Sequence, residues 1–129
     1  MRIAVIIIRI LMGLMFLFSS VVVLFKLVPM PALSGDVKTF MDGLMVSRYL
    51  FPLIKITELV CAIAFLVGRF VPLANVVLFP VTLNIVLYHA FVLPDGLLVA
   101  ILLLVGHLVL AYAYRDRYSA MLSANSKVL

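Results

Sequence analysis

The chain has 129 residues, of which 67% are hydrophobic and 12% are charged, with a formal net charge of +5. An ordinary soluble domain has about 45–50% apolar and about 25% charged residues. A mean hydropathy of +1.38 places most side chains in lipid rather than in water. The composition therefore excludes an ordinary soluble domain, and the scattered basic residues exclude nucleic acid as an expected partner.

The first apolar stretch runs from residue 3 to residue 28 and is interrupted only by Arg9 and Lys26. About 20 apolar residues are enough to cross a hydrocarbon core of about 30 Å. Its short basic start resembles a signal peptide, but the apolar run is too long for the hydrophobic part of one. This stretch therefore predicts a transmembrane helix.

The next segment, residues 29–50, contains prolines, glycines and charged residues that break the apolar pattern. Within it, residues 36–47 carry apolar side chains at helical spacing, with the charged side chains on another side. These apolar residues are Val37, Phe40, Met41, Leu44 and Met45. The pattern predicts a short amphipathic helix that lies at the membrane interface.

Three further apolar stretches follow, at residues 49–67, 70–93 and 97–114. The pair Gly68-Arg69 and the turn signal Pro94-Asp95-Gly96 separate them. Such short connections make consecutive helices antiparallel neighbours. The sequence thus predicts an all-α fold, an integral membrane four-helix bundle that forms a single domain over residues 1–129.

An even number of spans places both termini on the same side of the membrane. That side holds an excess of basic residues near the membrane: Arg2, Arg69, Arg115, Arg117 and Lys127. Because cytoplasmic loops are enriched in lysine and arginine, we expect both termini in the cytoplasm and the segment of residues 29–50 outside.

Glu58 is the outstanding polar residue, since a charge inside a membrane helix costs a few kcal/mol and marks a site by default. It lies about ten residues, or ~15 Å, inside its span. Lys55 is three residues earlier on the same helix face. Lys26 lies near the end of the first span, close to the same side of the membrane as Lys55. Glu58 is interpreted either as half of a structural ion pair or as a carboxylate that binds a ligand or handles protons.

Asn84 and Tyr88 lie four residues apart on one face of the third span, at a depth similar to that of Glu58. Ser19 and Ser20 reach the same level in the first span. These residues predict a polar pocket in the outer half of the bundle, between the first three spans. The alternative is that they form hydrogen bonds between helices.

Redox and metal chemistry within the chain are not expected. The single cysteine, Cys61, cannot form an internal disulfide or act as a dithiol. His89 and His107 differ in height by ~9 Å, which does not suit a bis-histidine haem. No cluster of acidic and histidine residues has metal-ligand spacing, so no metal or redox cofactor is expected, and a lipid-soluble molecule is the candidate ligand of the polar pocket.

The chain resembles the DoxX-like family of small four-helix bacterial membrane proteins over roughly residues 9–122. The resemblance is carried by LIKITELVCAIAFLVGRFVPLA at residues 53–74, PVTLNIVLYHAFVLPDG at residues 80–96, and YRDRY at residues 114–118. Its best element is Glu58 followed by the Gly68 turn. The resemblance implies a bacterial cytoplasmic (inner) membrane location, and it implies a functional role for Glu58 alone.

Name-giving relatives in this family are linked to quinone-reducing sulfur oxidoreductases, and others accompany redox-stress complexes. The resemblance implies an accessory or assembly subunit of a larger membrane complex, with other membrane subunits and the bilayer as partners. The alternative is a quinone- or amphiphile-binding subunit that uses the pocket around Glu58. We do not expect an enzyme that acts on its own, and association of copies into a homo-oligomer is compatible with the sequence.

Overall fold

The computed structural model describes residues 1–29 and 32–128, and the secondary structure in these ranges is entirely helical. The helices are α1 (Arg2–Leu24), α2 (Gly35–Val46), α3 (Leu50–Val67), α4 (Val71–Phe91), α5 (Leu97–Ala113) and α6 (Arg115–Tyr118). The all-α fold predicted from the sequence is confirmed.

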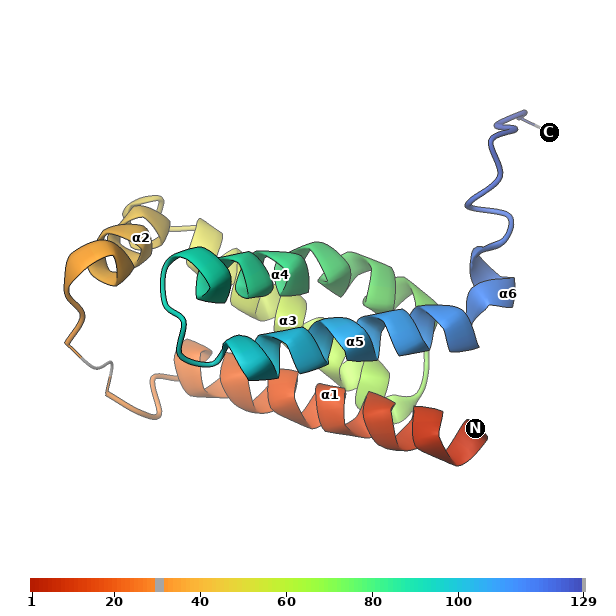
Figure 1. Cartoon of the computed structure of the whole chain (residues 1–129), viewed down its shortest axis with the longest axis horizontal. Coiled ribbons are helices and arrows are strands. Elements are labelled where there is room, and N and C mark those ends of the chain that lie inside the picture. The colour runs from red at the N-terminus through yellow and green to blue at the C-terminus, as the bar shows by residue number, and fades with distance from the viewer. Residues whose placement is uncertain (30–31, 129) are drawn as a thin grey trace.

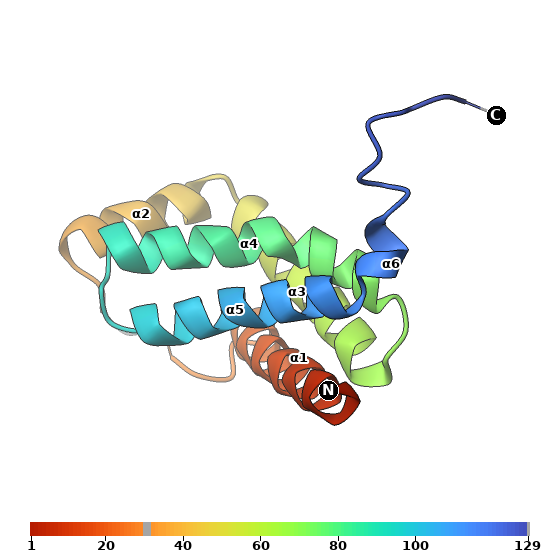
Figure 2. The same cartoon turned by 45° about the vertical axis from the view of Figure 1, so that its right-hand side comes forward.

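The four long helices form an antiparallel bundle, which Figures 1 and 2 show from two directions. Helices α1 and α4 each pack against both α3 and α5, so the bundle closes into a ring. Helix α2 lies at one end, beside the turn between α4 and α5, whereas the N-terminus and α6 lie at the other end (Figure 1). The short connections predicted this neighbour relationship among α3, α4 and α5.

The dimensions and surface of the bundle suit a membrane. Helices α1, α3 and α4 have 23, 18 and 21 residues and are apolar enough to span it. Helix α5 is also apolar and has 17 residues, or ~26 Å, close to the core thickness of about 30 Å. Large apolar side chains cover the outside of the bundle; Leu11, Val60 and Leu102 are each 60% exposed. The chain is therefore a multi-pass membrane protein.

The first span ends earlier than the apolar run suggested. The sequence predicted a helix to residue 28, but α1 ends at Leu24. Lys26 adopts a left-handed conformation with φ of 53°, and the Leu27 amide donates to the Val22 carbonyl over 3.0 Å. This backbone arrangement terminates helices, so Lys26 lies beyond the end of the helix in which the prediction placed it.

The amphipathic segment predicted at residues 36–47 is the helix α2. Its outer face carries an exposed ion pair, with Lys38 Nζ 2.6 Å from Asp42 Oδ2. Its other face turns half-buried side chains, including Phe40 and Met41, toward the bundle. That α2 lies at the membrane surface stays a prediction.

Large side chains from all four long helices fill the centre of the bundle, among them Phe16, Phe65, Leu78 and Leu110. Gly13 brings α1 close to α3, because a Cβ atom at this position would lie 2.9 Å from Leu66 Cγ. Small residues at helix contacts allow such close packing in membranes. The α1–α3 interface that results is the wall from which the candidate site is built.

Helix α6 fastens the chain to the beginning of α4. The Tyr118 hydroxyl donates a hydrogen bond of 2.7 Å to the Pro72 carbonyl. Burial raises the pKa of the Tyr118 hydroxyl, which keeps it protonated as a donor. This contact holds the end of α5 and the start of α4 together.

Candidate functional site

A cavity of about 590 Å³ opens between α1, α3 and α4, with side chains from α2 and α5 completing its wall. We call it the Glu58 pocket. Its polar lining residues are Ser19, Lys55, Glu58, Asn84, Tyr88 and His89. The remaining lining is apolar: Met15, Phe16, Phe40, Met41, Leu44, Phe51, Ile54, Pro80, Val81, Ile85, Val99 and Leu103. The pocket is thus a mostly apolar space with a few polar groups at one place.

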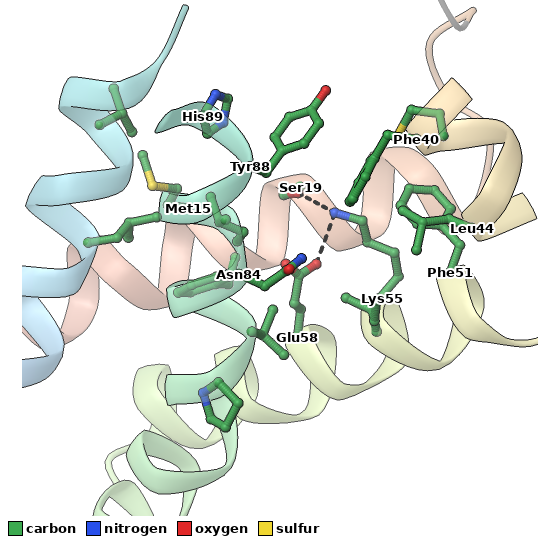
Figure 3. A pocket seen from close by; sticks show the side chains of 18 residues that line it. Met15, Ser19, Phe40, Leu44, Phe51, Lys55, Glu58, Asn84, Tyr88 and His89 are labelled. Atoms are coloured by element: carbon green, nitrogen blue, oxygen red, sulfur yellow. Dashed lines mark hydrogen bonds and ion pairs between the residues drawn. The ribbon is translucent and has the colours of Figure 1, made fainter. Parts of the chain in front are cut away.

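An ion pair on α3 forms the polar centre of the pocket. Lys55 Nζ lies 3.0 Å from Glu58 Oε2, and the two side chains are 13% and 2% exposed. Lys55 also donates a hydrogen bond of 3.0 Å to Ser19 Oγ on α1, as Figure 3 shows. The Lys55–Glu58 contact has the distance of an ion pair but not the angles of a hydrogen bond, so Glu58 Oε2 has no hydrogen-bond donor in the described part of the chain.

Helix α4 supplies two further polar groups. The Asn84 amide points toward the Glu58 carboxylate from the opposite wall (Figure 3). The Tyr88 ring packs against Phe40 of α2, with the ring centroids 4.9 Å apart and the ring planes tilted by 37°. Within residues 1–29 and 32–128, no hydrogen bond from the protein occupies the Asn84 amide or the Tyr88 hydroxyl. Both groups are therefore available to a ligand.

Helix α2 forms part of the pocket wall. Phe40, Met41 and Leu44 are the three residues of α2 that line it. They come from the apolar face that the sequence assigned to the membrane interface. The amphipathic pattern of α2 is thus explained in part by contact with the bundle, and not by lipid alone.

Four of the six residues singled out from the sequence meet in this pocket, namely Glu58, Lys55, Asn84 and Tyr88. Ser20 does not line it; its buried hydroxyl donates to the Phe16 carbonyl of its own helix over 2.7 Å. The neighbouring Ser19 lines the pocket and contacts Lys55 instead.

Lys26, the sixth residue, lies outside the Glu58 pocket. It lines a second cavity, of about 1000 Å³, together with Arg48. Phe51 lines both cavities and lies between them.

A buried polar network between α4 and α5 was not anticipated from the sequence. His107 Nδ1 lies 2.7 Å from Asn75 Oδ1, and His107 Nε2 lies 2.7 Å from Thr82 Oγ1. Asn75 Nδ2 also donates to the His107 carbonyl over 3.2 Å. Asn75 and Thr82 are seven residues apart, and this spacing on one helix face was the available signal.

The described residues offer little for metal or thiol chemistry. They contain no group of three or more His, Cys, Asp or Glu side chains placed to hold a metal ion. Cys61 is a buried free thiol. The chemistry of the site therefore lies in the Lys55–Glu58 pair and in the amide and hydroxyl groups that face it.

Comparison with known proteins agrees with this architecture. A family model described as DoxX matches residues 4–93, a range that contains every polar residue of the Glu58 pocket. Neither a curated protein nor a solved structure matches the chain. Because the family match covers well over half of the sequence, the chain belongs to the DoxX family.

Proposed function

We propose that the protein binds the head group of a quinone, or of a similarly built amphiphile, in the Glu58 pocket. The observation that carries this proposal is the position of the Lys55–Glu58 ion pair. It lies almost fully buried at the wall of a mostly apolar cavity. Ligand pockets typically combine about 300–1,000 Å³ of mostly apolar space with a few convergent polar groups.

The polar groups of the pocket suit a ring that carries carbonyl or hydroxyl oxygens. Lys55 and Asn84 can donate hydrogen bonds to a carbonyl oxygen, and the Glu58 carboxylate can accept one from a hydroxyl. The aromatic rings of Phe40, Phe51 and Tyr88 supply flat apolar surfaces for a ring system. A carbonyl oxygen of the oxidised quinone therefore suits Lys55 and Asn84, and a hydroxyl of the reduced quinol suits the Glu58 carboxylate.

We also propose that this binding serves a larger membrane complex, as the family resemblance implied. The pocket holds groups that bind and orient a ligand, so a partner chain would supply electron transfer. In that arrangement the protein is an accessory subunit that presents the amphiphile. Gentle detergent purification, followed by mass spectrometry of co-purifying chains, tests this part separately from ligand binding.

Calorimetric titration of the detergent-solubilised protein with a short-chain ubiquinone tests the binding proposal. We expect Lys55→Met to weaken binding by about tenfold or more, because hydrogen bonds to charged groups contribute ~1.5–3 kcal/mol. Lys38→Met is the matched control, since it breaks the exposed Lys38–Asp42 pair outside the pocket.

Asn84→Leu provides a variant whose folding is not at issue, because Asn84 is exposed and makes no hydrogen bond with the described residues. We expect it to weaken quinone binding while the helical circular dichroism signal and the melting temperature stay unchanged. Equal affinity of the original protein, Asn84→Leu and Lys55→Met would contradict the proposal.

A further inference from the structure

A third cavity lies at the opposite end of the bundle, between the start of α1 and the end of α5. Its volume is about 510 Å³, and its lining includes Arg2, Arg9 and Arg115. We call it the arginine pocket. Figures 1 and 2 show that these two helix ends lie at the same end of the molecule. Arg2 and Arg9 are two helical turns apart and therefore share one face of α1.

The three arginines line one cavity, and no carboxylate lines it with them. Within the described residues, the ion pairs between side chains are Lys38–Asp42 and Lys55–Glu58, and neither involves the arginine pocket. No acidic side chain lines the cavity. Three like charges around one space repel each other, and an anion placed between them removes that repulsion.

Arg115 is oriented by contacts that leave most of its hydrogen-bond donors open. Arg115 donates to the Tyr112 carbonyl over 2.8 Å, and its guanidinium carbon lies 4.3 Å from the centre of the Tyr112 ring. These contacts use one of five N–H donors and orient the guanidinium. The guanidinium of Arg9 lies against the turn between α3 and α4, since a Cβ atom at Gly68 would be 2.7 Å from Arg9 Nη1. An anion in the cavity would accept hydrogen bonds from the Arg115 donors that remain open.

The position of the pocket identifies the kind of anion. It lies at the end of two membrane helices, within about two turns of the start of α1, where phospholipid phosphates lie. Arginine is the side chain that best matches phosphate oxygens, because its planar fork donates two parallel hydrogen bonds. Basic pockets between membrane helices on the cytoplasmic side bind anionic head groups.

We propose that the arginine pocket binds the phosphate of an anionic phospholipid and anchors this end of the bundle in the leaflet that is rich in such lipids. This site is independent of the Glu58 pocket. The apolar side chains that surround the arginines, such as Ile6 and Ala113, would lie against the upper part of the acyl chains.

Native mass spectrometry of the protein released from nanodiscs tests this site. The nanodiscs contain phosphatidylcholine and phosphatidylglycerol in equal amounts. We expect the original protein to retain phosphatidylglycerol in preference to phosphatidylcholine by about tenfold, and this preference to fall as salt is raised. Equal retention of the two lipids by the original protein would overturn the proposal without the use of any variant.

The variants locate the site. Arg115→Gln and the double variant Arg2→Gln/Arg115→Gln are expected to lose most of the preference for phosphatidylglycerol. Arg69→Gln is the matched control, because it removes the same charge at the same end of the bundle but lies outside the pocket. Loss of the preference in Arg69→Gln to the same extent would show a general charge effect and would overturn the proposal.

A second experiment distinguishes binding of a lipid phosphate from binding of free phosphate. Inorganic phosphate at millimolar concentration is added to the protein in phosphatidylcholine nanodiscs and, separately, in mixed nanodiscs. We expect it neither to stabilise the protein against heat nor to displace phosphatidylglycerol. Displacement by inorganic phosphate would contradict the assignment to a lipid head group.

Discussion

Lys55 Nζ lies 3.0 Å from Glu58 Oε2 one helical turn away, and the same ammonium donates to Ser19 Oγ on the neighbouring helix α1. A single buried cation therefore joins the carboxylate of α3 to the hydroxyl of α1. Removal of one partner from a buried ion pair leaves an uncompensated charge, which costs ~3–5 kcal/mol. We therefore expect the loss of either partner to destabilise the bundle, in addition to removing a candidate ligand contact.

Glu58→Leu is expected to lower the free energy of unfolding by ~3–5 kcal/mol, because Lys55 then loses its counter-charge. Glu58→Gln is expected to cost less, since an amide oxygen in this position can accept a hydrogen bond from the ammonium. Thermal unfolding in detergent, followed by circular dichroism, measures both. Equal melting temperatures for Glu58→Leu and the original protein would show that the pair carries no stability.

Thr82→Val is expected to destabilise the bundle by ~1–3 kcal/mol, because it leaves the buried His107 Nε2 without its partner at 2.7 Å. Thr57→Val is the matched control, since the Thr57 hydroxyl donates only to the Leu53 carbonyl of its own helix. The same thermal measurement applies. A larger loss in Thr57→Val than in Thr82→Val would refute the structural role of the α4–α5 network.

Gly68→Ala is expected to destabilise the turn between α3 and α4 for two reasons. Gly68 has a backbone φ of 81°, which residues with a Cβ atom rarely adopt. The new Cβ atom would also lie 2.7 Å from Arg9 Nη1. Gly43→Ala is the control, because nothing lies within 4 Å of its Cβ position and alanine favours the interior of α2. We expect a lower melting temperature for the first variant and no decrease for the second.

The membrane orientation is tested by labelling introduced cysteines in intact cells. On a Cys61→Ser background, Lys38→Cys in α2 is expected to react with an impermeant maleimide, whereas Asn125→Cys is expected to react only after lysis. This result follows from the excess of basic residues at the end that holds both termini. Reaction of Asn125→Cys in intact cells would contradict the predicted orientation.

The polar centre of the pocket was predictable because it follows from helical periodicity and depth. Glu58 and Lys55 share a face of one helix, Asn84 and Tyr88 share a face of another, and both pairs lie at a similar depth in the membrane. The sequence therefore identified these residues without knowledge of how the helices pack.

The remaining features depend on relationships between elements, which a single sequence does not report. Ser19 and not Ser20 faces Lys55 because of the rotation of α1 about its axis, and adjacent residues point about 100° apart on a helix. Lys26 was misplaced because its left-handed conformation ends α1 early. The partnership of His107 with Asn75 and Thr82 joins two helices, and only their packing brings these side chains together.

The contact of α2 with the Glu58 pocket could not be predicted from the sequence either. An amphipathic pattern predicts one apolar face, but it does not say whether lipid or protein covers that face. The contact between Phe40 and Tyr88 joins α2 to α4, which are separated in the sequence by α3. In this protein the apolar face of α2 serves as part of the pocket wall.

The most direct measurement of the central claim is photo-crosslinking with an azidoquinone in nanodiscs, followed by peptide mass spectrometry. We predict that the label attaches to residues that line the Glu58 pocket, such as Met41, Phe51 and Tyr88, and that excess unlabelled quinone prevents it. Label spread over lipid-facing residues such as Val60 and Leu102, unaffected by competition, would contradict the claim that this pocket binds the head group.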